Sequence, residues 1–351
     1  MKFSSSFTRI FFVLILFGHS AAIAQEPSTT MLSPRAIMAN PQTGKVYAAD
    51  SKSGVVSVFN PRTASVFRVE VGSMPIALAV NPVTNRIYVA NFRGASLSVI
   101  DGANDSVVST LSVGERPYAI AVNPATNKIY VSNQFSDTVR IVDGVTDAIS
   151  SFVAGSFNAI AADSVLGRVY LLGYEDPDLK VLGDGKAVVK RIPIGMHQWA
   201  VAVDEGAASL YVTRIGNAEL AIVEERGGAV ARVPTGSFPC AVEFNATTKK
   251  IYVVNHGDDT VTVIDASRRV PIATVKVGHK PQGIAIDRKA NRIYVANRNE
   301  STVTVIDGAT DKVLKTVPSP RNPFALSVDE STGRLFAALV DGTSAEIAGL
   351  P

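Results

Sequence analysis

A repeat of about 41 residues runs through most of this 351-residue chain. Its clearest marker is an aromatic residue inside an Ile-Tyr-Val-Ala-Asn-like segment. The aligned positions are Tyr47, Tyr88, Tyr130, Tyr170, Tyr211, Tyr252, Tyr294 and Phe336, and successive members lie 40 to 42 residues apart. Such regular spacing is typical of supersecondary units that stack on their neighbours. The fold must therefore be built from copies of one module.

Each module contains four runs rich in β-branched and aromatic residues, separated by Gly, Pro, Asn and Asp. In the second repeat these runs are residues 76–80, 86–91, 97–101 and 107–113. The first two runs are apolar at consecutive positions, as in strands covered on both faces, and the fourth alternates as near a solvated edge. A meander of this kind needs neighbours, and its period is that of a propeller blade. We therefore predict an all-β propeller of four-stranded antiparallel blades.

The number of strands predicts how the ring closes. The first three strands of the module occur eight times, but the fourth occurs only seven times because the chain stops at Pro351. We expect eight blades, with Ser28–Ser33 near the N-terminus supplying the outer strand of the last blade. This latch would join both chain ends in one sheet and leave no open blade edge. The alternative is a seven-bladed ring with the last repeat packed elsewhere.

Residues 1–24 have the parts of a secretory signal peptide. A positively charged start precedes a short apolar run at residues 10–17, and Ala22–Ala24 is a small-x-small cleavage site. The run is shorter than the ~20 apolar residues of a membrane anchor, and no cysteine lies nearby for lipidation. We expect a single propeller domain over residues 25–351, periplasmic or secreted, without a membrane anchor.

The strand sequences resemble those of YVTN-repeat β-propellers, a family of extracytoplasmic proteins. The resemblance is carried by Ile87–Asn91, Tyr130–Asn133, Tyr252–Asn255 and Tyr294–Asn297, which precede strands such as Thr260–Asp265. It covers the chain after the leader and is strongest in repeats two, three, six and seven. It implies a propeller outside the cytoplasm, and related propellers are sometimes enzymes.

The charge of the chain excludes some classes of binding partner, and its cysteine content excludes stabilisation by an internal disulfide. The chain has 34 Lys and Arg against 31 Asp and Glu, a net charge of +3. Near-neutrality argues against a nucleic-acid or anionic-membrane binder, which concentrates basic charge. Cys240 is the only cysteine, so no internal disulfide can form and stability must come from packing. No nucleophile-elbow, zincin, Cys-x-x-Cys or phosphate-loop motif occurs, which argues against catalysis. We predict no cofactor and expect a monomer.

Candidate functional residues lie in two sets of loops, those leading into the first strand of each repeat and those between the second and third strands. In a propeller these loops share one face of the ring, here called the loop face, where sites are usually built. The candidate ligand-binding residues are Arg116, His197, Trp199, Arg214, His256, His279, Lys280 and Arg321. The basic ones suit an acidic small molecule or a carboxylate. Ordinary solvated surface charge is the alternative interpretation.

Repeats four and five depart most from the pattern. Trp199, beside His197, could stack on a ligand ring or could fill a wider gap between irregular blades. A metal site made of His256, His279 and Cys240 is a weak alternative, because no short ligand spacing supports it. The asparagines that end the second strands are expected to hydrogen-bond within their own turns rather than to act in catalysis.

The leading hypothesis is a non-catalytic extracytoplasmic binding protein that holds an unidentified small molecule or protein partner on the loop face. One alternative is a propeller enzyme, either a lactonase-like hydrolase or a metal- or quinone-dependent oxidoreductase. The other is a structural cell-surface repeat protein.

Overall fold

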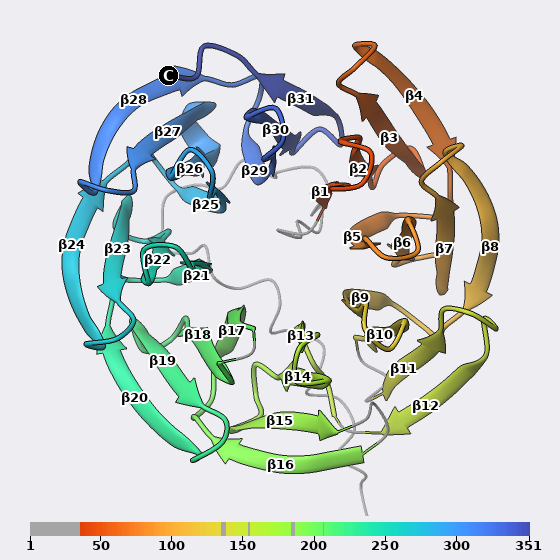
Figure 1. Cartoon of the computed structure of the whole chain (residues 1–351), viewed down its shortest axis with the longest axis horizontal. Helices are drawn as coiled ribbons and strands as arrows, with labels where there is room; N and C mark the ends of the chain where they lie inside the picture. Colours follow the sequence, from red (N-terminus) through yellow and green to blue (C-terminus); the bar gives the residue numbers. More distant parts are fainter. Residues whose placement is uncertain (1–35, 135–137, 154, 184–186, 206) are drawn as a thin grey trace, which may run out of the picture. The chain divides into compact units, whose positions relative to one another are not determined.

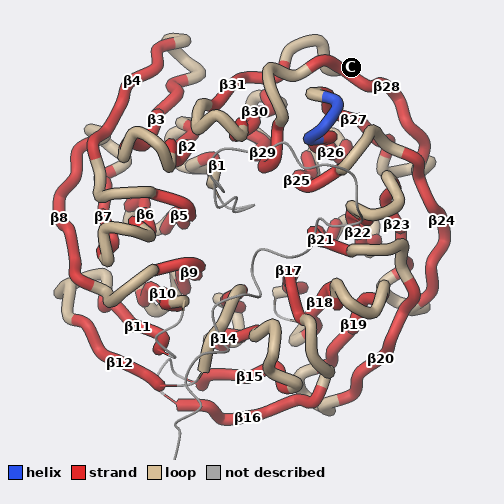
Figure 2. The backbone as a smooth tube through the Cα atoms, turned by 180° about the vertical axis from the view of Figure 1, so that it is seen from behind, coloured by secondary structure: helices blue, strands red, loops and turns tan. Residues whose placement is uncertain are grey.

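The computed structural model describes residues 36–134, 138–153, 155–183, 187–205 and 207–351, all within a compact unit formed by Leu32–Pro351. In these residues 31 β-strands form eight sheets arranged as blades around a common axis (Figure 1). The described part contains one short 3-10 helix, η1 (Arg298–Glu300), drawn in blue in Figure 2. No described helix has the length and hydropathy that a membrane span requires.

The first four blades are formed by consecutive strands. Blade 1 contains β1 (Ile37–Ala39), β2 (Val46–Asp50), β3 (Val55–Asn60) and β4 (Ser65–Glu70). Blade 2 contains β5 (Pro75–Asn81), β6 (Arg86–Asn91), β7 (Ser96–Asp101) and β8 (Ser106–Ser112). Blade 3 contains β9 (Pro117–Asn123), β10 (Lys128–Asn133), β11 (Thr138–Asp143) and β12 (Ile149–Val153). Blade 4 contains β13 (Ala159–Asp163), β14 (Arg168–Leu172), β15 (Asp178–Gly183) and β16 (Ala187–Pro193).

The same order continues to the end of the chain. Blade 5 contains β17 (Gln198–Asp204), β18 (Ser209–Arg214), β19 (Glu219–Glu224) and β20 (Ala229–Pro234). Blade 6 contains β21 (Pro239–Asn245), β22 (Lys250–Asn255), β23 (Thr260–Asp265) and β24 (Val270–Lys276). Blade 7 contains β25 (Pro281–Asp287), β26 (Arg292–Asn297), β27 (Thr302–Asp307) and β28 (Lys312–Pro318). Blade 8 contains β29 (Pro323–Asp329), β30 (Arg334–Leu339) and β31 (Ser344–Ile347).

Each blade is an antiparallel meander, with its first strand nearest the axis and its last strand on the rim (Figure 1). Tyr88 of β6, for example, lies opposite Ala79 on β5 and Val99 on β7. In β6 every residue after Arg86 is buried, whereas β8 is mostly exposed. The predicted order of strands and their covered and solvated faces are therefore confirmed.

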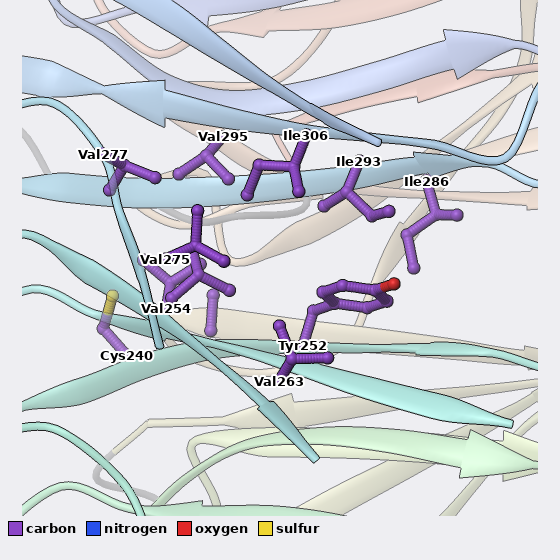
Figure 3. Packing of buried hydrophobic residues seen from close by; sticks show 12 residues of the cluster. Cys240, Tyr252, Val254, Val263, Val275, Val277, Ile286, Ile293, Val295 and Ile306 are labelled. Carbon is purple, nitrogen blue, oxygen red and sulfur yellow. The ribbon is translucent and has the colours of Figure 1, made fainter. Parts of the chain in front are cut away.

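The hydrophobic core lies between the blades. One cluster joins Tyr252 and Val263 of blade 6 to Ile286, Ile293 and Val295 of blade 7 (Figure 3). Equivalent clusters join blades 1 and 2, 3 and 4, 4 and 5, 5 and 6, and 7 and 8. Since burial of apolar area is worth about 25 cal/mol per Å², most of the stabilisation of each blade comes from its neighbours.

A polar clamp repeats on the face opposite the loop face. Lys45, directly before β2, lies 2.6 Å from an oxygen of Asp105 in the next blade, and the Tyr47 hydroxyl donates to the other oxygen at 2.7 Å. In blade 6 the ammonium group of Lys250 lies 2.7 Å from Asp311 of blade 7, to which Tyr252 also donates. The second strand of one blade is thereby tied to the outer hairpin of the next.

Blades 8 and 1 close the ring through hydrogen bonds and an aromatic contact of their own. The backbone N–H of Ala39 donates to the Ser327 hydroxyl at 2.8 Å, and Arg334 donates to the Pro61 carbonyl at 2.8 Å. The rings of Phe59 and Phe336 lie 4.8 Å apart at the centre of this interface. Figure 2 shows β29–β31 beside β1–β4. The eight-bladed prediction is confirmed, and the seven-bladed alternative is wrong.

The described part of blade 8 lacks an outer strand. The tail after β31 contacts blade 7 instead, where Lys315 donates to the Gly349 carbonyl at 3.0 Å. The predicted latch segment, Ser28–Ser33, lies outside the described residues. The latch therefore stays a prediction.

The latch prediction implies that deletion of residues 26–33 lowers the melting temperature by roughly 5 °C, because the edge of β31 would then be left uncovered. Thermal unfolding followed by circular dichroism measures the shift. A melting temperature equal to that of the undeleted protein would show that these residues do not cover the edge.

Arg334→Ala is expected to destabilise the ring closure. Its guanidinium group bonds to Pro61, pairs with Glu346 and lies 4.9 Å from the centre of the Phe59 ring. Loss of these contacts should cost about 2 kcal/mol, or roughly 4 °C in melting temperature. Arg321→Ala is the matched control, because the Arg321 side chain is 84% exposed. Equal melting curves for the two variants would contradict the closure role.

Candidate functional site

Hydrogen bonds join the two sets of loops on the predicted loop face. Six of the loops that lead into inner strands contain a residue with left-handed backbone: Met74, Arg116, His197, Phe238, Lys280 and Asn322, with φ between 43° and 56° apart from 65° at His197. The carbonyl of each accepts a hydrogen bond from the first N–H after the second strand of its blade, at 2.9 to 3.2 Å. Non-glycine residues rarely adopt this backbone. Its recurrence therefore shows that these six loops share one backbone conformation and one hydrogen bond.

A buried asparagine ends the second strand in several blades. The Asn91 side-chain amide donates to the hydroxyls of Ser96 and Ser98 on β7, at 3.0 and 2.9 Å. Asn255 and Asn297 make the same two bonds to threonines on β23 and β27. These asparagines thus bind within their own hairpins, as expected, and form the floor of the loop face.

Charged pairs replace this arrangement in blades 4 and 5. Arg214 occupies the asparagine position in blade 5, where its side chain is only 9% exposed and pairs with Glu219. It also donates from Nε to the Met196 carbonyl at 3.1 Å. In blade 4, Lys180 lies 2.6 Å from Asp176 and is equally buried. Arg214 therefore holds a loop in place, and its charge is already neutralised.

An aromatic cluster lies above these pairs and is formed by Tyr174, His197 and Trp199. The Tyr174 ring centre lies 5.1 Å from that of His197 and 6.3 Å from that of Trp199, which it meets edge-on. All three side chains are half-buried, and the neighbouring Met196 is 44% exposed. Tyr174 comes from the β14–β15 loop, whereas the other two come from the start of blade 5. The structure thus brings His197 and Trp199 together with Tyr174, which was not among the predicted site residues.

Trp199 sits at an irregularity in its strand. The register of β17 against β18 shifts between Gln198 and Val201, and β21 shifts in the same way around Cys240. Such bulges turn a side chain out of the regular pleat. Trp199 packs against the hydrophobic cluster of blades 6 and 7, so it also fills space between blades, as the alternative interpretation expected. The Trp199 backbone carbonyl is also fixed, since it accepts a bond from Asn158 of blade 4 at 3.0 Å.

Blade 6 continues the site with buried groups. The Phe238 and His256 rings lie 5.6 Å apart, and His256 Nδ1 donates to the Pro281 carbonyl at 2.9 Å. Burial lowers the pKa of His256 and raises the pKa of the Cys240 thiol to about 12. Both groups are therefore uncharged at neutral pH.

The remaining predicted residues lie at the exposed margin of the loop face. His279 Nδ1 contacts Asp259 at 2.9 Å, and the same carboxylate accepts the Lys280 backbone N–H at 2.8 Å. Arg116 and Arg321 are exposed in blades 3 and 8. Arg116, Lys280 and Arg321 thus come from three different blades and do not gather into one pocket of charge.

The alternative metal site is not formed. Cys240 Sγ lies 3.7 Å from the carbonyls of Pro281 and Gln282, and His256 also turns towards Pro281. His279 pairs with Asp259 instead. Across the described ranges, no group of three or more His, Cys, Asp or Glu side chains is placed to hold a metal ion.

The solved structures that are similar to this propeller include two enzymes by name. Dihydro-heme d1 dehydrogenase NirN in complex with DHE superposes with a TM-score of 0.74 at 14% identity, over 88% of this chain and 69% of that chain. Kuenenia stuttgartiensis hydrazine synthase superposes with a TM-score of 0.61 at 16% identity, over 93% of this chain and 99% of that chain. At these identities the likeness shows the fold alone.

Among curated proteins, none matches this sequence. The family model of YNCE-like β-propellers matches residues 76–338, well over half of the chain. This match and the eight-bladed ring agree with the resemblance to YVTN-type repeats. The chain therefore belongs to the YNCE-like β-propeller family.

Proposed function

We propose that this protein is an extracytoplasmic binding protein that holds a small planar acid on its loop face. The aromatic cluster of Tyr174, His197 and Trp199 carries the proposal. Three half-buried rings and an exposed methionine from consecutive blades offer a contact surface for a flat apolar ring. Each such ring contact is worth about 0.5–1.5 kcal/mol beyond area burial.

Charge on the rest of the loop face supports an acidic ligand. Lys280, Arg116 and Arg321 lie on loops of other blades around the same face. The lysine and arginine nearest the cluster, Lys180 and Arg214, are already paired with carboxylates. Ring contacts therefore supply affinity, whereas Lys280, Arg116 and Arg321, the last of which also lies 3.9 Å from Asp341, supply long-range attraction and orientation. The extracytoplasmic location rests on the leader sequence.

The state of the buried reactive groups favours binding over catalysis. A nucleophilic cysteine needs a lowered pKa, whereas the pKa of Cys240 is raised to about 12 by burial. The proton on His256 Nδ1 is engaged by the Pro281 carbonyl. An enzyme is the second candidate, because two of the similar solved structures are enzymes by name.

Binding can be followed through Trp199, which is the only tryptophan of the chain. We expect at least one member of a panel of planar acids, such as flavin mononucleotide, protoporphyrin IX and indole-3-acetate, to change its fluorescence and raise the melting temperature. His197→Ala and Tyr174→Ala should each weaken that ligand about tenfold, because each removes one ring contact.

Arg93→Ala is the matched control, since Arg93 is an exposed loop-face residue of blade 2. It should bind like the natural protein. If no planar acid raises the melting temperature, the proposal is contradicted and the structural cell-surface repeat protein becomes the better interpretation. If a bound ligand is converted to product, the enzyme alternative replaces this proposal.

Cys240 should be inert in the folded protein. Because its pKa is raised, the reactive thiolate is scarce at about pH 8 and becomes abundant only as the pH rises towards 12. Ellman's reagent should therefore react with Cys240 only as fast as the protein unfolds, and stoichiometrically in urea. Rapid labelling under native conditions would show an activated thiol and favour the enzyme candidate.

A further inference from the structure

Three asparagines of the loop-face floor have an amide atom that the protein does not satisfy. Asn91, Asn255 and Asn297 are 0% exposed, and each uses Nδ2 to donate to two hydroxyls of the next strand. No donor among the described residues reaches Oδ1 of any of the three. The same feature occurs in blades 2, 6 and 7, so it belongs to the repeated design of the blade.

Rotation of the amide does not remove the problem. A flipped side chain would place Oδ1 where the two hydroxyls can donate to it, since hydroxyls donate and accept equally well. The NH₂ group would then occupy the position of the oxygen and would itself need an acceptor. Either orientation therefore requires one further partner at each site.

Without this partner, each amide would lower the stability of the folded protein. A buried polar group without a hydrogen bond lowers the folding equilibrium constant by a factor of roughly 5 to 150. Three such groups together would remove much of the roughly 10³–10⁸ typical of a folded domain. Buried polar atoms of this kind are usually satisfied by ordered water.

Blade 5 shows what happens when the asparagine is replaced. Arg214 stands at the equivalent position, and its guanidinium group bonds to the Met196 carbonyl and to Glu219. A Cβ added to the adjacent Gly195 would lie 2.4 Å from this guanidinium, and a Cβ at the equivalent Gly72, Gly236 or Gly278 would lie 2.6 to 2.7 Å from the asparagine side chain, so both kinds of side chain pack directly under the loop. In blade 5 the donors of Arg214 thus have protein partners, and this side chain has no oxygen that would need a donor of its own.

We infer that one internal water molecule binds at the side-chain amide of each of Asn91, Asn255 and Asn297 and links it to the loop above. Water suits the site because it can donate to Oδ1 and accept from a neighbouring N–H. A metal cation would need several oxygen ligands, and across the described residues no group of three or more His, Cys, Asp or Glu side chains is placed to hold one. The three waters are thus permanent parts of the loop-face floor.

A crystal structure of the mature protein at about 1.5 Å tests this directly. We expect ordered water within about 2.6–3.2 Å of the free amide atom at all three asparagines. A protein N–H or hydroxyl found there instead, or empty density at any of the three, would overturn the inference.

Oxygen-17 magnetic relaxation dispersion provides a second readout in solution, because it counts long-lived internal waters. Asn255→Leu should lower that count by one, since leucine has no polar atom to hold the water. Arg214→Leu is the matched control at the equivalent position of blade 5 and should not lower the count. An unchanged count in Asn255→Leu would contradict the water site. The outcome is independent of any ligand on the loop face.

Discussion

Contact between neighbouring blades is the interaction on which the rest of this structure depends. Tyr47, Tyr88, Tyr130, Tyr170 and Tyr252 are all less than 2% exposed, yet each lies on the second strand of a sheet only four strands wide. A separate blade would leave these rings in water on one side. Burial is complete only when every blade has two neighbours, so the ring must close, and blades 8 and 1 repeat the packing found elsewhere.

Much of the fold could be predicted from the sequence because this constraint acts on every repeat. The tyrosine spacing marks the second strand, and the apolar runs around it mark strands covered on both faces. The contacts that close the ring could not be predicted in the same way. Arg334 and Pro61 are separated by 273 positions, and they meet only because eight blades complete the circle. Neither residue differs in kind from many others in the chain.

The candidate site was less predictable, because a sequence does not show which carboxylate pairs with a given lysine or arginine. In the sequence, Arg214 resembles an exposed cation of a loop. In the structure, Arg214 on β18 pairs with Glu219, which lies directly opposite on β19. That pairing was available from the strand pattern, since the two residues flank one tight turn. Tyr174 could be suspected only from its place after β14, in a repeat that lacks the usual asparagine. Its proximity to His197 depends on how blades 4 and 5 meet.

The two faces of the ring use polar residues for different purposes. On one face Lys45 and Lys250 make the same clamp to a carboxylate of the next blade, and this repetition holds the ring together. On the loop face, the asparagine–hydroxyl arrangement of blades 2, 6 and 7 is replaced by ion pairs in blades 4 and 5. Because each replacement satisfies its own polar groups, the blade frame stays the same while the chemistry above it changes. A propeller can therefore acquire an aromatic surface in one sector without loss of the packing that keeps its blades in place.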